Sequence, residues 1–150
     1  MIRILLPLVG WMLWVGAAEK PPLLFRIHLQ APEGVKGMVT VPVNLFSPPE
    51  TIAIRNIPEV SERDLLGAKL LADGTVLVQL NDFGKTKLEV ATSSGRGLIL
   101  VVIVNGRVVY APLIDIPLTQ GKIALPSGSL LPKEIESMND QKSALGGKTT

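Results

Sequence analysis

The sequence contains no cysteine among its 150 residues. No disulfide can therefore stabilise the fold, and no cysteine is available for the acylation that anchors a lipoprotein. The chain must instead pack around an aliphatic core. About 130 residues follow the N-terminal segment, which is enough for one core that buries about two thirds of the unfolded surface. We therefore expect a single domain.

Aromatic residues are also scarce, at 4% of the chain, and both tryptophans lie in the first fifteen residues. The rest of the chain has only Phe25, Phe46, Phe83 and Tyr110. These are too few for a surface that stacks sugars or the bases of single-stranded nucleic acid. The formal net charge of +2 falls to about +1 without Arg3, so no basic surface for nucleic acid is expected either.

Patterns that carry catalysis or metal binding are missing as well. His28 is the single histidine, and we predict it on the polar face of a strand, as an ordinary surface residue. Without a second histidine or a cysteine the chain has no zinc ligand set, and no Gly-x-Ser-x-Gly motif is present. A serine–lysine dyad stays open, because sequence alone does not reveal one. We predict no catalytic residue, no metal site and no cofactor.

The glycine-rich stretch at residues 93–97 resembles a phosphate-binding loop. However, it follows a predicted helix, so the negative end of the helix dipole would face a bound phosphate. We interpret it as the turn that ends this helix.

What the N-terminus does contain is a lone positive charge at Arg3, an apolar run over residues 4–15 and small side chains at 16–18. This order is typical of a secretory signal peptide. The run is shorter than the roughly 20 residues of a membrane-spanning helix, and it contains a proline and a glycine. We predict a signal peptide over residues 1–18, its cleavage, and export to the periplasm or the cell exterior. The alternative is an uncleaved anchor.

Apolar side chains that alternate with polar ones predict three strands near the start of the domain, at residues 23–30, 38–46 and 51–55. In the second strand, the side chains that would face the core are those of Val39, Val41, Val43 and Leu45. Pro42 lacks an N–H and therefore indicates a sheet edge or a bulge.

The remainder of the chain predicts a mixture of helices and strands. Residues 98–104 are the longest apolar stretch here and predict a central strand, and Asn105-Gly106 predicts the turn of a hairpin. The other expected elements are a short helix at 61–64, a hairpin at 69–80, a helix at 83–93, a strand at 121–125 and a helix from Pro132 to Met138. The helix at 83–93 would bury Phe83, Leu88, Val90 and Ala91.

These elements predict an α+β fold, with a mostly antiparallel sheet of about seven or eight strands and two or three helices packed on one face. We expect one domain over residues 19–139. Residues 140–150 offer little to bury, so we expect a disordered tail there.

The run at residues 104–114, with Asn-Gly followed by Tyr-Ala-Pro, resembles the head subdomain in the first extracytoplasmic domain of SecD, a protein-export factor. The segments that agree with it in order are 61–66, 80–88, 121–125 and 132–135. The resemblance covers residues 57–139. SecD has transmembrane helices, and we expect none after the signal peptide, so a motor function does not carry over.

This resemblance implies a module that contacts polypeptide, with no catalytic residue to transfer. Its expected contact region is the surface of the hairpin, at Asn105, Gly106, Arg107, Tyr110 and Pro112, although a purely structural turn is the alternative. We therefore predict a secreted, non-enzymatic domain that binds a polypeptide or an envelope protein. The other hypotheses are an extracytoplasmic hydrolase or small-ligand enzyme that uses His28, and a passive envelope component that self-associates near Pro42.

Overall fold

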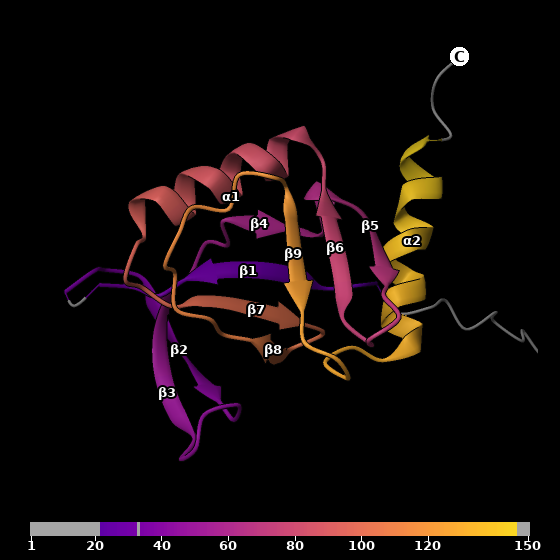
Figure 1. Ribbon diagram of the computed structural model, residues 1–150. Coiled ribbons are helices and arrows are strands. Elements are labelled where there is room, and N and C mark those ends of the chain that lie inside the picture. The colour runs from indigo at the N-terminus through magenta and orange to yellow at the C-terminus, as the bar shows by residue number, and fades with distance from the viewer. Residues whose placement is uncertain (1–21, 33, 147–150) are drawn as a thin grey trace, which may run out of the picture.

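The computed structural model describes residues 22–32 and 34–146, with side chains as far as Asp140 (Figure 1). The predicted signal peptide, residues 1–18, and the last four residues of the predicted tail lie outside the described residues. None of the helices in the described part of the chain is long and apolar enough to cross a membrane.

A four-stranded antiparallel sheet forms the centre of the domain, in the order β4-β1-β7-β8. Its strands are β1 (Phe25–Leu29), β4 (Val60–Ser61), β7 (Leu100–Val104) and β8 (Arg107–Tyr110). Strand β7 lies inside the sheet and is almost fully buried, as its apolar sequence predicts. Asn105 (φ 48°) and Gly106 (φ 83°) both have positive φ, so the predicted Asn-Gly hairpin is confirmed.

A three-stranded antiparallel sheet packs on one face of the central sheet, in the order β5-β6-β9. It contains β5 (Leu65–Leu70), β6 (Val76–Leu80) and β9 (Lys122–Leu125). The helices α1 (Asp82–Ser94) and α2 (Pro132–Gly146), with the short 3-10 helix η1 (Glu62–Asp64), complete this side. The larger core lies here, between the two sheets and the helices.

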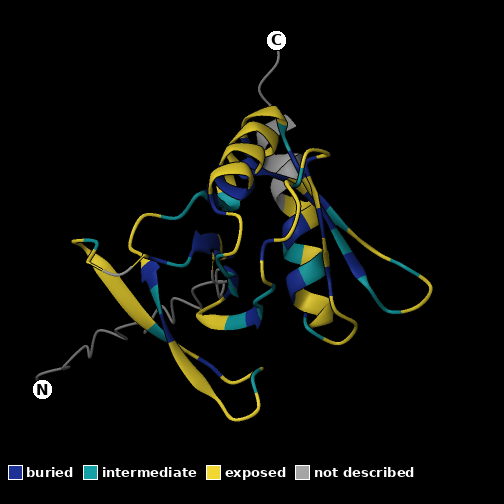
Figure 2. Cartoon of the chain, turned by 60° about the vertical axis from the view of Figure 1, so that its left-hand side comes forward, coloured by how far each residue is buried: buried dark blue, intermediate teal, exposed yellow. Residues whose placement is uncertain are grey.

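The opposite face of the central sheet is covered by a two-stranded ribbon of β2 (Met38–Val43) and β3 (Glu50–Arg55). Val43, Ile52 and Ile54 of the ribbon pack on Val101 of β7 in a second, smaller core. The ribbon extends away from the rest of the domain (Figure 1), and much of its surface is exposed (Figure 2). Strand β7 therefore contributes side chains to both cores.

Two parts of the predicted core are wrong. Val39 and Leu45 are exposed, because Val39 lies on β2 whereas β3 is the strand that bridges to Gln30 after β1, and Leu45 lies in the connection between β2 and β3. Phe83 and Val90 of α1 are also exposed, whereas the helix buries Gly84, Leu88, Ala91 and Thr92. The helix itself forms as predicted, but it is turned about its axis so that a mostly small-residue face packs inward.

His28 is a third correction, because it is buried and not an ordinary surface residue. Its strand alternates as predicted, and the side chain does lie on the face opposite the larger core. The ribbon covers that face, and the His28 Nδ1 lies 2.8 Å from the carbonyl oxygen of Arg55 at the end of β3.

The predicted fold class, α+β with antiparallel strands, is confirmed. The described residues form nine strands, and these are divided among three sheets instead of belonging to one. Helix α2 continues to Gly146, so it includes residues 140–146 of the segment that the sequence predicted as a disordered tail.

Candidate functional site

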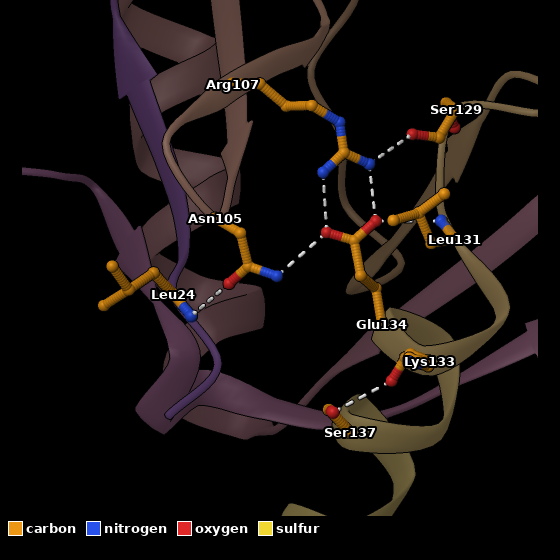
Figure 3. A network of polar contacts seen from close by, with 8 residues as sticks. All are labelled: Leu24, Asn105, Arg107, Ser129, Leu131, Lys133, Glu134 and Ser137. Carbon is orange, nitrogen blue, oxygen red and sulfur yellow. Dashed lines mark hydrogen bonds and ion pairs between the residues drawn. The ribbon is translucent and has the colours of Figure 1, made fainter. Parts of the chain in front are cut away.

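The structure separates the predicted contact residues of the hairpin into two groups. The first group is Asn105 and Arg107, whose side chains turn toward the start of α2 (Figure 3). Arg107 donates to both carboxylate oxygens of Glu134, at 2.7 Å from Nη1 to Oε2, and also to the Ser129 carbonyl. Asn105 donates to Glu134 Oε2 at 2.9 Å and accepts from the Leu24 N–H at 3.1 Å. Both side chains thus tie parts of the domain together.

Glu134 is the centre of this network, and its side chain is only 5% exposed. A buried carboxylate is costly unless its oxygens are bonded, and here the Leu131 N–H supplies a further donor. The hydrogen bonds from Arg107 lower the pKa of Glu134 below its usual value and outweigh the effect of burial. The same pairing raises the pKa of Arg107. The network joins the hairpin, β1 and α2 into one unit.

Tyr110 and Pro112 form the second group, and both line an apolar cleft with a volume of about 620 Å³. This volume lies within the roughly 300–1,000 Å³ that is typical of ligand pockets. One wall comes from Leu100, Tyr110 and Pro112 of the β7–β8 hairpin, and the facing wall is residues 122–124 of β9. The cleft is open to solvent.

Residues 111–121, which connect β8 to β9, form the rim of this cleft. Leu113 and Ile116 are 65% and 66% exposed, respectively, and both lie on the cleft lining, beside the more buried Ile114 and Leu118. Such a cluster of exposed aliphatic side chains in a hollow is typical of a binding surface. The cleft lining also carries one charge of each sign, Asp115 on the rim and Lys122 on β9.

The rim is held in place at two points, Ile114 and Leu118. The Ile114 N–H donates to the Leu98 carbonyl at 2.8 Å, which continues the β7–β8 pairing. The Leu118 N–H donates at 2.8 Å to Oγ1 of Thr92, a fully buried residue of α1 whose hydroxyl in turn donates to the Leu88 carbonyl. The exposed residues 115–117 therefore lie between two positions that are fixed by hydrogen bonds.

The structure leaves His28 apart from the cleft, since it is not among the residues that line it. Burial lowers the pKa of His28 below its usual value, and the bond to Arg55 opposes that shift only in part. Within the described residues, no group of three or more histidine, aspartate or glutamate side chains is placed to hold a metal ion.

The sequence named Tyr110 and Pro112 as possible contact residues, and both line the cleft, but it singled out neither the rim nor the part of the predicted strand at 121–125 that lines the cleft. A signal was present, because Leu113, Ile114, Ile116 and Leu118 are apolar, and the last three recur at every second position. Apolar residues in an irregular, proline-containing connection are typical of loops with a binding role.

No protein-family model matches the chain, and no curated protein matches it in sequence. Two solved structures of SecDF have its fold. One, of SecDF as a membrane component that enhances protein export, has a TM-score of 0.56 at 20% identity, over 79% of this chain and 60% of that one. The other, a crystal structure of SecDF in its super-membrane-facing form, has a TM-score of 0.58 at 18% identity, over 80% of this chain and 18% of that one.

These likenesses confirm the predicted SecD-like fold. The chain spans less than two thirds of either SecDF chain, so these likenesses describe the architecture of the domain and not the activity of the larger protein.

Proposed function

We propose that this SecD-like domain works outside the cytoplasm, where it contacts polypeptides in connection with protein export and catalyses no reaction itself. The observation that carries the proposal is the apolar cleft between the β7–β8 hairpin and β9, in a fold shared with SecDF.

The chemistry of the cleft suits an unfolded segment better than a small polar ligand. Leu113 and Ile116 expose aliphatic surface at its rim, and Tyr110 and Pro112 add apolar surface beside them. An unfolded polypeptide exposes apolar side chains that a folded one buries. Transfer of these side chains from water into the cleft lowers the free energy and so favours binding. Asp115 and Lys122 balance each other in charge, which gives no preference for an anionic or cationic client.

The contact region that we predicted at the hairpin accordingly shifts along β8. Asn105 and Arg107 are engaged with Glu134, so we propose Tyr110 and Pro112, together with Ile116, as the residues that touch the client. Gly106 then serves the turn, where its φ of 83° suits glycine.

A pair of matched substitutions tests the proposal. Ile116→Asp places a charge on the cleft rim, and Val90→Asp places one on α1, at a β-branched residue of similar exposure (66% and 63%). We expect I116D to weaken the binding of an unfolded model protein about tenfold, which corresponds to about 1.4 kcal/mol, and V90D to leave it unchanged. Binding is measured by calorimetry with reduced, alkylated lactalbumin. Equal binding by the wild type and I116D would contradict the role of the cleft.

A photo-reactive amino acid in place of Ile116 tests whether the cleft contacts exported polypeptides in the cell. We expect it to crosslink to several polypeptides in transit, whereas the same group in place of the exposed Glu89 on α1 does not. Crosslinking of Ile116 to one folded envelope protein alone would instead favour a dedicated partner.

A further inference from the structure

We infer that the cleft receives its polypeptide as an added β-strand, antiparallel to β9 and paired with the outer edge of that strand. This inference rests on the proposed function and specifies how the client is held. The feature behind it is the position of β9 at the end of the β5-β6-β9 sheet.

The register of β6 and β9 shows which backbone groups point outward. Gln79 stands opposite Lys122 and Leu77 opposite Ala124, and continuing this register places Leu80 opposite Gly121. The Leu80 N–H donates to the Gly121 carbonyl at 2.8 Å, so these two residues form a hydrogen-bonded pair. Opposed residues of an antiparallel pair alternate between bonding each other and pointing away. Lys122 and Ala124 therefore direct their N–H and C=O groups away from β6.

That outer edge borders the cleft, because residues 122–124 line it. In the part of the chain that the structure describes, β6 is the only strand that pairs with β9. Figure 1 shows β9 in front of the β1–β7 pair, with the connection from β8 passing beside it. One wall of the apolar cleft is therefore a strand edge whose N–H and C=O groups point away from β6. This is the arrangement used in recognition by strand addition.

The side chains of an added strand would then fall into two sets. Side chains of opposed residues lie on the same face of a sheet. Lys122 and Ala124 are exposed, whereas Ile123 between them is 4% exposed and belongs to the larger core. In an antiparallel partner, residues that bond to Lys122 and Ala124 therefore face solvent, and the residues between them face Ile123 and Leu100. The cleft thus selects extended segments in which every second residue is apolar.

A synthetic peptide of alternating valine and threonine is the probe. Its valines face inward, and its threonines carry the N–H groups that pair with β9. N-methylation of the threonines should weaken binding more than tenfold, because it removes those donors, whereas N-methylation of the valines should change it less than threefold. Binding is measured by calorimetry on the full chain.

The possible outcomes separate the two proposals. If both methylated peptides bind as well as the parent, strand addition is wrong while cleft binding stands. If loss follows the valines instead, the antiparallel orientation is wrong. If the parent peptide does not bind at all, while the unfolded model protein still does so in an Ile116-dependent manner, strand addition is again overturned and the proposed function survives.

Variants of Ala124 give an independent test on the protein. Ala124→Pro removes the outward N–H, and proline is tolerated at such positions on edge strands. Ala124→Thr keeps the N–H and enlarges the side chain. We expect A124P to lose binding of the parent peptide and A124T to retain it, and circular dichroism checks that both variants are folded. Loss in A124T with retention in A124P would contradict the inference.

Discussion

His28 is the residue whose environment differs most from what its own strand indicates. Alternation places it correctly on the polar face of β1, but alternation carries no information about what packs on that face. The β2–β3 ribbon does so, and its closing residue Arg55 supplies the carbonyl that His28 meets at 2.8 Å. Arg26 opposes and Glu59 favours protonation, and both act less strongly than burial does.

The burial of His28 predicts an acid-sensitive fold. Its folded pKa is below the unfolded value of 6.5, so the unfolded state binds more protons as pH falls from 6.5 toward the folded pKa. The stabilising contribution is complete above about pH 6.5 and is lost below it. Urea unfolding should therefore give a lower free energy at pH 5.5 than at pH 7.5. A His28→Asn variant should show a smaller difference, and an unchanged difference would contradict this role of His28.

The pairing of Arg107 with Glu134 contributes to stability in a way that can be measured. Arg107→Ala should lower the free energy of unfolding by about 2 kcal/mol at pH 7, because it leaves the buried Glu134 without its bidentate partner. Arg107→Lys, which keeps the charge but loses the paired geometry, should fall between that variant and the wild type. Chemical unfolding checks the order. Because the pKa of Glu134 is lowered in the folded state, the stabilisation by the Arg107–Glu134 pair is present above the usual carboxylate pKa of 4.5. It is lost as pH falls through the lowered value.

At the scale of elements, the strands and turns with strong local signals are predicted well. The Asn105-Gly106 hairpin forms with a positive φ at both residues, and in the turn between β5 and β6 Gly74 has a φ of 88°, a conformation that favours glycine. Asp73 does not have a positive φ. The capping box of η1, between Ser61 and Asp64, also forms as the sequence indicates.

The orientation of α1 could not be predicted in the same way. Its inward face is Gly84, Leu88, Ala91 and Thr92, and three of these four residues carry little hydrophobic signal. At position 84 the inward-facing residue must be glycine, because a Cβ there would come within 2.8 Å of the Cβ of Asp64. Close approach of backbones thus decides which face is buried, and no periodicity of apolar residues reports it.

The side chain of Asn139 bonds helix α2 to the edge of β5. The Asn139 amide accepts from the Ala68 N–H and donates to the Ala68 carbonyl, both at 3.0 Å, and so takes the place of a neighbouring strand. Gly67 permits this approach, since a Cβ there would lie 2.7 Å from Asn139 Oδ1.

Loss of this amide should loosen the edge of β5. Asn139→Ala should lower the free energy of unfolding by about 1–2 kcal/mol and speed hydrogen exchange at Ala68. Ser137→Ala, one half-turn away with a hydroxyl that bonds only within α2 to Lys133, should have a smaller effect. Equal effects in the two variants would show that Asn139 does not hold the strand. Nuclear magnetic resonance measures the exchange at single residues.

At the scale of the whole molecule, the sequence predicts strands and hairpin pairs but not the pairing of strands that lie far apart in the chain. β6 pairs both with its neighbour β5 and with β9, about forty residues further along the chain. The division into three sheets follows from such distant pairings, which local patterns do not encode. The cleft escaped prediction for the same reason, since its walls come from α1, β6, β7, β8, β9 and the connection between the last two strands.

The two cores predict unequal stability across the molecule. Val43 is fully buried in the small core, so Val43→Ala should cost about 2 kcal/mol, whereas Thr40→Ala on the exposed part of the same strand should cost little. We expect V43A to increase hydrogen exchange in β2 and β3 much more than in β7, because β7 is also packed in the larger core. A uniform increase over all strands would show that the two cores unfold as one.

Tyr110 lies in the wall of the cleft and is the one tyrosine of the whole sequence. A sample isotopically labelled at tyrosine alone therefore yields ring resonances from a single site, and that site adjoins the proposed client. Chemical-shift changes of this one ring during a titration would report occupancy directly, with no dye or engineered tag, and would follow the exchange of successive ligands in real time.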